Sequence, residues 1–267
     1  MSRLYIVEGM PCCGKSTTAR HVADRLKKAG RRTVCVDEGG GDHPADYEFS
    51  AYVREEEIPL FQKDLQDKIR AWGEPGRGGY ILPLGRFGGA ELERLLPYKI
   101  YDGLPWEAER PLMLDKWEAF AREAEQDAVY VFNCVFLQNP MCETMMRFGF
   151  AQEQSLEYIH SIAEIIAPLE PAVIYLKSGD IAENIRAAAE ERPGWLDEVI
   201  SYHANGAYGK SIGAKGFDGY IACLEERQRR ELEILPELGL QSLVLDGPRQ
   251  EWNNKICSFI GARPRTF

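Results

Sequence analysis

The residues with the clearest chemical potential lie near the start of the chain, where the segment GMPCCGKS has the spacing G-x-x-x-x-G-K-[ST]. Gly9 and Gly14 permit backbone angles that a Cβ would forbid, so successive N–H groups can turn toward phosphate oxygens. Lys15 can bring a cation to the terminal phosphates of a nucleotide, and the Ser16 hydroxyl can ligate Mg²⁺. The segment therefore predicts a phosphate-binding loop composed of Gly9, Met10, Pro11, Cys12, Cys13, Gly14, Lys15, Ser16 and Thr17.

The sequence on either side of this segment agrees with that prediction. Residues 4–7 form a continuous apolar run, which is typical of a strand buried on both faces. After the loop, apolar residues recur at helical spacing as far as Leu26, and Gly30 follows as a stop signal. A helix in this place would direct its positive dipole end at bound phosphates. The alternative is an ordinary glycine turn between a strand and a helix.

Four further apolar runs follow along the chain and alternate with helical patterns. This alternation predicts crossover connections, and hence an α/β three-layer sandwich in which helices cover both faces of a mainly parallel five-stranded sheet. Because such sheets bind ligands at the carboxyl ends of their strands, we expect Asp37, Glu38 and Asn133 near the loop. The five runs are residues 4–7, 33–36, 128–132, 172–176 and 242–246, and further helices are expected near 61–72, 115–124, 153–167 and 222–235.

Two regions lack a clear periodicity. Residues 73–89 are rich in glycine and are expected to form a permissive loop, within a substrate-side segment at about 73–112. This loop is interpreted either as a surface excursion or as a flap whose arginines, Arg77 and Arg86, face an anion. Residues 192–220 combine glycines with lysines, a composition that suits a mobile lid. The chain as a whole, 1–267, is expected to be a single domain that carries these insertions.

Composition and charge narrow the classes of function. Of the 267 residues, 45% are hydrophobic and 28% are charged, as in ordinary globular proteins, and the net charge is −10. An acidic chain without a basic stripe predicts no nucleic-acid partner. No apolar run reaches the roughly 18 residues of a membrane helix, so we expect no membrane segment and a cytoplasmic location. The seven cysteines have no metal-ligand spacing and are expected to be free thiols.

Cys12 and Cys13 support a sharper hypothesis about the loop. Amide dipoles and the charge of Lys15 would lower the pKa of these thiols, which would make the loop sensitive to oxidation or alkylation. The alternative is that both cysteines only fill space in the loop.

With these features the chain resembles a P-loop kinase of the nucleoside and nucleotide kinase group, within the P-loop NTPase superfamily, and thymidylate kinase is the nearest member in layout. The resemblance rests on the segment from Gly9 to Thr17, on the acidic residues after the second strand and on the lid-like stretch after the fourth strand. It implies ATP as phosphoryl donor with Mg²⁺, a small-molecule acceptor, and lid arginines that close over the transferred group. Members of this group often pair through helices, so a homodimer is one option for this chain.

One position departs from the pattern of this group. Its members often carry an acidic residue followed by arginine at the end of the third strand, where this chain has Asn133 and Cys134. Either Asp37 or Glu38 takes over the acidic role, or Ser16, the phosphates and water hold the metal by themselves. The departure is also compatible with a kinase-like protein whose chemistry has changed.

Phosphoryl transfer depends mainly on positioning and on neutralising charge. Lys15 and lid arginines are expected to supply that charge, with Arg192 and Arg186 as the lid candidates. If the acceptor is a hydroxyl, a carboxylate should take its proton. The resemblance to deoxynucleoside kinases makes Glu38 the first candidate for this base and Asp37 the second. The competing interpretations are that both carboxylates face solvent and that both arginines only pair with neighbouring glutamates.

We therefore expect an ATP-dependent kinase that acts on a nucleoside, a nucleotide or another hydroxyl-bearing metabolite. The alternative is a nucleotide-binding switch protein with little or no transfer, which Asn133 suggests. A sulfotransferase-like use of the loop is less favoured, because that chemistry does not require the full loop ending in Lys15 and Ser16.

Overall fold

The computed structural model describes residues 2–261, and the chain divides into two compact units. Met1–Glu38 and Ala121–Phe267 form the first unit, and Gly39–Phe120 forms the second. The loop residues from Gly9 to Thr17, both candidate carboxylates and both candidate lid arginines belong to the first unit. The second unit is therefore an insertion in a chain whose candidate site is built by the first.

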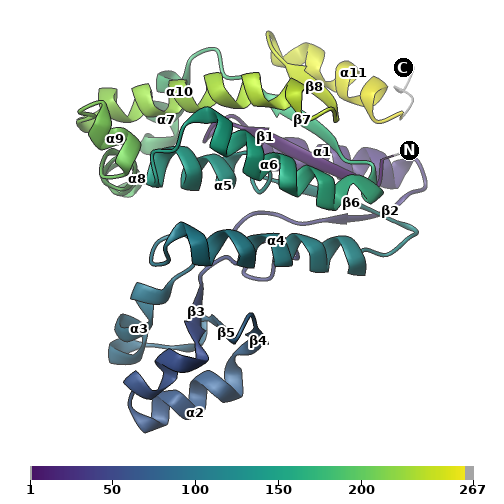
Figure 1. The fold of residues 1–267 in the computed structure, drawn as a ribbon. Coiled ribbons are helices and arrows are strands. Elements are labelled where there is room, and N and C mark those ends of the chain that lie inside the picture. Colours follow the sequence, from purple (N-terminus) through teal and green to yellow (C-terminus); the bar gives the residue numbers. More distant parts are fainter. Residues whose placement is uncertain (1, 262–267) are drawn as a thin grey trace. The chain divides into compact units, whose positions relative to one another are not determined.

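A five-stranded sheet in which every pairing is parallel forms the centre of the first unit (Figure 1). Its strands are β1 (Leu4–Gly9), β2 (Arg32–Cys35), β6 (Ala128–Asn133), β7 (Ala172–Leu176) and β8 (Gln241–Leu245). They lie in the order β2-β6-β1-β7-β8, so the predicted α/β fold with a five-stranded parallel sheet is confirmed. The chain leaves β1 toward one edge of the sheet and leaves β6 toward the other. The switch point of the topology thus lies between the ends of β1 and β6.

Helices cover both faces of this sheet. The helices of the first unit are α1 (Lys15–Lys28), α5 (Gln138–Met141), α6 (Gln152–Ile166), α7 (Ile181–Glu191), α8 (Trp195–Ala204), α9 (Ala207–Ser211), α10 (Gly216–Glu237) and α11 (Arg249–Phe259), with a π-helical turn over Cys142–Arg147. α1 and α11 pack on one face, and the right-handed crossovers place α6 and α10 on the other. In the part of the chain that the structure describes, no helix combines the length and the apolar composition that a membrane crossing requires.

The central strands are buried on both faces, which explains why their sequences are continuous apolar runs. Val7 of β1, Val131 of β6 and Ile174 of β7 share a core with the apolar stripe of α1 through Leu26. Since successive residues of a strand point to opposite faces, Glu8 points toward the layer of α6 and α10. A carboxylate is thereby placed inside the molecule, directly beneath the start of the loop.

The expectation of an aperiodic stretch over residues 192–220 is wrong at the level of secondary structure. α8 and α9 lie within this stretch, and α10 begins at Gly216 instead of Ala222. No residue of α8 is buried. Its apolar residues Trp195, Leu196, Val199 and Ile200 do recur at helical spacing, a signal that the sequence analysis missed, and they are half-buried.

The second unit contains a three-stranded antiparallel sheet with helices packed against it. Its hydrophobic core includes Ile58, Leu65 and Ile69. Its strands, in the order β3-β5-β4, are β3 (Ser50–Arg54), β4 (Glu74–Gly76) and β5 (Gly79–Pro83). Its helices are α2 (Lys63–Trp72), α3 (Gly89–Leu95) and α4 (Trp106–Glu123), with 3₁₀ turns over Glu55–Leu60, Leu84–Arg86 and Leu96–Tyr98.

The permissive loop expected over residues 73–89 is instead a β-hairpin. β4 and β5 are joined by Arg77 and Gly78, whose φ angles of 47° and 75° suit a two-residue hairpin turn. Three of the glycines that suggested an irregular loop, Gly76, Gly78 and Gly79, thus lie in the hairpin, while Gly85 lies in the 3₁₀ turn that follows and Gly89 begins α3. Nη2 of Arg77 donates to Asp115 at 2.6 Å, so one of the two arginines expected in a flap forms an ion pair within its own unit.

Replacing Ile174 by alanine should lower the free energy of unfolding by about 2–5 kcal/mol, because Ile174 is fully buried and its truncation leaves a cavity beneath α1. Val244→Ala on the adjacent strand β8 is the matched control. Val244 is 42% exposed, so its truncation should cost about 1 kcal/mol or less. Urea unfolding followed by circular dichroism measures both changes, and equal losses in the two variants would contradict the prediction.

Candidate functional site

A tight loop joins β1 to α1 and requires unusual backbone angles. Gly9, Cys12 and Gly14 have φ angles of 141°, 63° and 98°. Gly9 pairs with Leu176 of β7, and a Cβ on Gly9 would lie 2.5 Å from the Leu176 carbonyl oxygen. Glycine at position 9 is therefore a steric requirement of the sheet itself.

The N-terminus of α1 follows this loop directly. Gly14 is the N-cap of the helix and contributes no side-chain oxygen to the first N–H groups. Lys15, Ser16 and Thr17 form the first turn and line a cavity. Amides at the positive end of a helix dipole suit an anion in that cavity.

Lys15 lies folded against the loop that precedes it. Its Nζ donates to the carbonyl oxygens of Gly9 at 3.1 Å and Met10 at 2.8 Å, and the residue is 8% exposed. These contacts hold the ammonium group in the wall of the cavity. A charged phosphate oxygen is a stronger acceptor than either carbonyl and can compete for the same N–H groups.

The cavity has a volume of about 700 Å³ and lies within the first unit. Besides the loop it is lined by Glu38 beyond β2, Gln138 beyond β6, Arg192 and its neighbours beyond β7, and Arg249 beyond β8. All these segments follow the carboxyl ends of strands, where a parallel sheet binds its ligands. The size is that of an ordinary small-molecule site.

The two candidate carboxylates lie in different places. Glu38 lines the cavity, and its Oε1 accepts a hydrogen bond from Nε2 of Gln138 at 3.1 Å. Oδ2 of Asp37 instead accepts from Nε and Nη2 of Arg20, at 3.0 and 2.7 Å, on the exposed side of α1. Of the residues named for this role, the cavity contains Glu38 and not Asp37. Glu191 at the end of α7 is a further carboxylate in its lining.

Asn133 connects three segments at the switch point of the sheet. Its Nδ2 donates to the Ser16 hydroxyl at 3.3 Å, while its Oδ1 accepts from the Glu38 amide at 3.2 Å. The residue is fully buried. A carboxylate here would accept hydrogen bonds only, whereas the amide both donates and accepts. Asn133 thus ties the start of α1 to the end of β2.

The two candidate lid arginines also lie in different places. Arg192 lines the cavity, and its guanidinium lies 5.6 Å from the ring centre of Trp195, another lining residue. The Arg186 guanidinium lies 4.5 Å from the ring centre of Phe217 and is outside the cavity lining. The fold therefore brings Arg192 to the loop and holds Arg186 against α10.

Several cavity residues were not named as candidates in the sequence analysis, among them Arg249, His203 and Tyr220. Arg249 donates from Nη2 to the Cys13 carbonyl at 3.2 Å. His203 and Tyr220 stack on one another with ring centres 5.4 Å apart. The position of Arg249 directly after the fifth apolar run was a usable signal, since that place is a strand end. His203 lies on α8 and Tyr220 lies on α10, just before the predicted start of that helix at Ala222, and only the fold brings the two rings to the loop.

The hypothesis of activated thiols in the loop is wrong. Burial raises the pKa of Cys12 and of Cys13 and outweighs the opposing effect of nearby Lys15. Burial also raises the pKa of Cys134 far above that of an ordinary thiol. All seven cysteines are free, as expected.

Within residues 2–261, no group of three or more His, Cys, Asp and Glu side chains could hold a metal ion. The Ser16 hydroxyl, in the cavity wall, fits a Mg²⁺ ion whose other ligands are phosphate oxygens and water.

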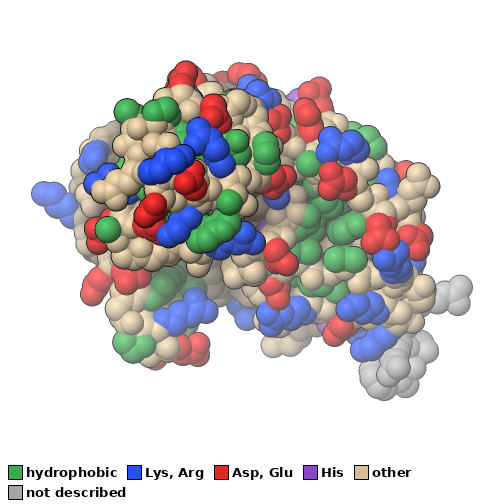
Figure 2. All heavy atoms as spheres, turned by 90° about the horizontal axis from the view of Figure 1, so that it is seen from below, with side chains coloured by type: hydrophobic (Ala, Val, Ile, Leu, Met, Phe, Trp, Pro, Cys, Tyr) green, Lys and Arg blue, Asp and Glu red, His purple; other side chains and the backbone are tan. Residues whose placement is uncertain are grey.

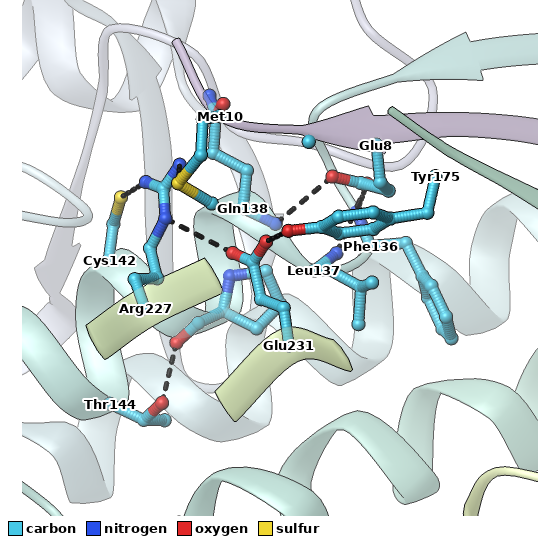
Figure 3. Close-up of polar contacts among 12 residues, drawn as sticks. Glu8, Met10, Phe136, Leu137, Gln138, Cys142, Thr144, Tyr175, Arg227 and Glu231 are labelled. Atoms are coloured by element: carbon cyan, nitrogen blue, oxygen red, sulfur yellow. Dashed lines mark hydrogen bonds and ion pairs between the residues drawn. The ribbon is translucent and has the colours of Figure 1, made fainter. Parts of the chain in front are cut away.

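Glu8 fixes the turn that follows β6 (Figure 3). Its carboxylate accepts from the amides of Phe136 at 2.8 Å, Leu137 at 3.1 Å and Gln138 at 3.2 Å. Complete burial and the charge of Glu231 raise the pKa of Glu8 to about 7, although the three amides oppose this shift. Glu8 therefore determines where Gln138 lies, and Gln138 in turn contacts Glu38.

A scan of protein-family models finds no match to this chain, and no curated protein matches it significantly. The function must therefore be inferred from the fold and from the geometry of this cavity.

The variant Glu8→Gln should remove a pH dependence of stability. Because folding raises the pKa of Glu8 from 4.5 to about 7, the contribution of Glu8 to the free energy of unfolding is fully present below about pH 4.5 and is lost as the pH rises through about 7. The stability advantage of the wild type over Glu8→Gln should thus shrink between about pH 5 and pH 8. Thermal unfolding across this range measures the difference, with exposed Glu237→Gln as control. A constant difference would refute the assignment.

Proposed function

We propose that this protein is a P-loop kinase that transfers the γ-phosphoryl group of ATP to a small hydroxyl-bearing molecule, such as a nucleoside, a nucleotide or a related metabolite. One observation carries the proposal. A single cavity at the switch point of a parallel sheet contains the loop that ends in Lys15, the carboxylate of Glu38 and the guanidinium of Arg192. These are the anion-binding, proton-accepting and charge-neutralising groups that phosphoryl transfer needs.

The loop and α1 account for binding of the donor. Backbone amides from Cys12 to Thr17, at the positive end of α1, would donate to the β- and γ-phosphates. Lys15 exchanges its carbonyl partners for phosphate oxygens, and Arg249 adds a cation beside Gly14. Ser16 would hold a Mg²⁺ ion together with phosphate oxygens and water, and the ion would supply positive charge to those phosphates.

Glu38 accounts for activation of the acceptor. The acceptor oxygen forms a bond to the γ-phosphorus while the bond from that phosphorus to ADP breaks, and the hydroxyl proton passes to the Glu38 carboxylate. Gln138 orients this carboxylate by a hydrogen bond to Oε1. Arg192, at the start of the predicted lid segment 192–220, stabilises the negative charge on the transferred group. The products are ADP and the phosphorylated acceptor.

A second candidate function is a nucleotide-dependent switch with little transfer. Asn133 supports it, because the amide that contacts Ser16 and Glu38 does not titrate and cannot take the role of an acidic residue at this place. A switch protein would capture a partner only when nucleotide is bound, and it would show no turnover that depends on an acceptor.

The surface charge bears on the kind of partner. On the face shown in Figure 2, Lys and Arg side chains are interspersed with Asp and Glu side chains and form no continuous basic band. A nucleic-acid backbone binds to concentrated positive charge. The mixed charge of this face agrees with the prediction that the acceptor is a small molecule.

The variant Lys15→Ala should weaken Mg·ATP binding and lower acceptor-dependent ATP consumption by at least about a hundredfold, because one cation at the transferred phosphates is lost. Calorimetry with Mg·ATP, together with an ATP-consumption screen over nucleosides, nucleotides and hydroxylated antibiotics, measures both effects. Lys177→Ala is the control, since Lys177 pairs with Asp246 at 2.7 Å on the surface. The kinase proposal fails if a folded wild type binds ATP without any acceptor-dependent turnover.

The variant Glu38→Gln should lower turnover by about a hundredfold or more while the KM for ATP changes little, because a glutamine cannot accept the acceptor proton. Asp37→Asn should have a much smaller effect, since Asp37 pairs with Arg20 away from the cavity. Steady-state kinetics with the acceptor found in the screen compares the two. A larger loss in Asp37→Asn would reverse the assignment of the base.

A further inference from the structure

Arg227 lies behind the loop, inside the layer formed by α10. The residue is 1% exposed, and its partner Glu231, one helical turn further on, is completely buried. Nε of Arg227 lies 3.1 Å from Oε1 of Glu231, and the Tyr175 hydroxyl donates to the other Glu231 oxygen at 2.7 Å. The guanidinium is thus held in one orientation between α10 and β7 (Figure 3).

The other edge of the guanidinium faces sulfur atoms. Nη2 lies 3.5 Å from Sδ of Met10, which belongs to the loop, and Nη1 lies 3.1 Å from Sγ of Cys142. Sulfur is a weak acceptor and carries no full negative charge here. The positive charge of Arg227 is therefore balanced by Glu231 on one edge only and acts on the loop from the other.

The charge of Arg227 is also felt in the cavity wall. Burial and the charge of Arg227 together lower the pKa of His203 to about 4. Lys15 and His203 both line the cavity in front of the loop, whereas Arg227 supports the loop from behind. A fixed cation in such a dry place acts over a longer range than one in water.

We propose that Arg227 is a positioning residue for the anion site: it holds the loop in place through Met10, and its fixed charge favours phosphate oxygens in the cavity. This inference deepens the proposed kinase function. It rests on that function only in taking the bound anion to be a nucleotide. A buried ion pair is often no more stable than an apolar replacement. We therefore attribute the ion pair of Arg227 and Glu231 behind the loop to its action on the anion site and not to stability alone.

The test removes both charges at once. In Arg227→Met with Glu231→Gln, no lone buried charge remains, and the glutamine oxygen can still accept from the Tyr175 hydroxyl. We expect binding of Mg·ATP and of tripolyphosphate, measured by calorimetry, to weaken about ten- to hundredfold. We also expect faster amide hydrogen exchange over residues 10–14. The matched control is Arg229→Met on the same helix, since the Arg229 side chain is 50% exposed and pairs with Glu226 and Glu233.

Two single variants separate position from charge and keep the test valid if the double variant fails to fold. Arg227→Lys retains the charge without the planar group, so it should recover part of the anion affinity while the loop amides still exchange fast. Met10→Leu keeps the ion pair intact and removes the sulfur contact. It should increase exchange of the loop amides with little change in the unfolding midpoint.

The outcomes distinguish this inference from the kinase proposal. Wild-type affinity and wild-type loop exchange in the double variant, or in Met10→Leu and Arg227→Lys, would overturn the role of Arg227. If the wild type binds tripolyphosphate but no nucleotide, and the double variant loses this binding, the kinase proposal is contradicted and the role of Arg227 is supported. A wild type that binds neither anion would overturn both.

Discussion

Parallel pairing of β1 with β6 on one side and β7 on the other is the constraint on which the rest of the structure depends. The pairing places Val7 opposite Asn133 and Gly9 opposite Leu176. It thereby aligns the strand ends from which the loop and the Asn133 contacts extend. A slip of one residue would turn Val7 toward α10 and Glu8 into the apolar core beneath α1. The apolar core under α1 and the position of the site are thus set by the same register.

The opposite face of the sheet carries polar groups at its centre, and they belong to the site. Glu8 anchors the turn after β6, Tyr175 and Glu231 fix Arg227, and Arg227 contacts Met10 of the loop. Groups of this kind are costly to bury unless they are paired. Each of them reaches a partner on another element, so the loops after β1 and β6 are tied to the layer of helices behind them.

Asn133 is the point at which the chemistry of this chain departs from the group that it resembles. Because it bridges Ser16 and Glu38, it organises the site by hydrogen bonds and supplies no negative charge. In the proposed kinase the negative charge near the transferred group would come from Glu38, and Lys15 and Arg192 line the same cavity as its positive counterparts. A kinase with this arrangement relies on a carboxylate beyond the second strand of the sheet and uses the third for positioning.

Patterns of neighbouring residues predicted the strands and the turn that depend only on local sequence. The apolar runs predicted the five strands of the parallel sheet, because buried strands must be apolar on both faces, and the spacing of Gly9, Gly14 and Lys15 predicted a turn before α1. The hairpin at Arg77 and Gly78 and the helix α8 escaped prediction because each lies among glycines, which favoured the interpretation as irregular loops. Tertiary structure alone decided which charged groups meet. It directed Asp37 to Arg20 and Glu38 to the cavity, although the two are neighbours in the chain, and it brought Arg227 behind Met10 from the far end of the sequence. Such choices depend on the packing of segments that are distant in sequence, and no local pattern of residues contains them.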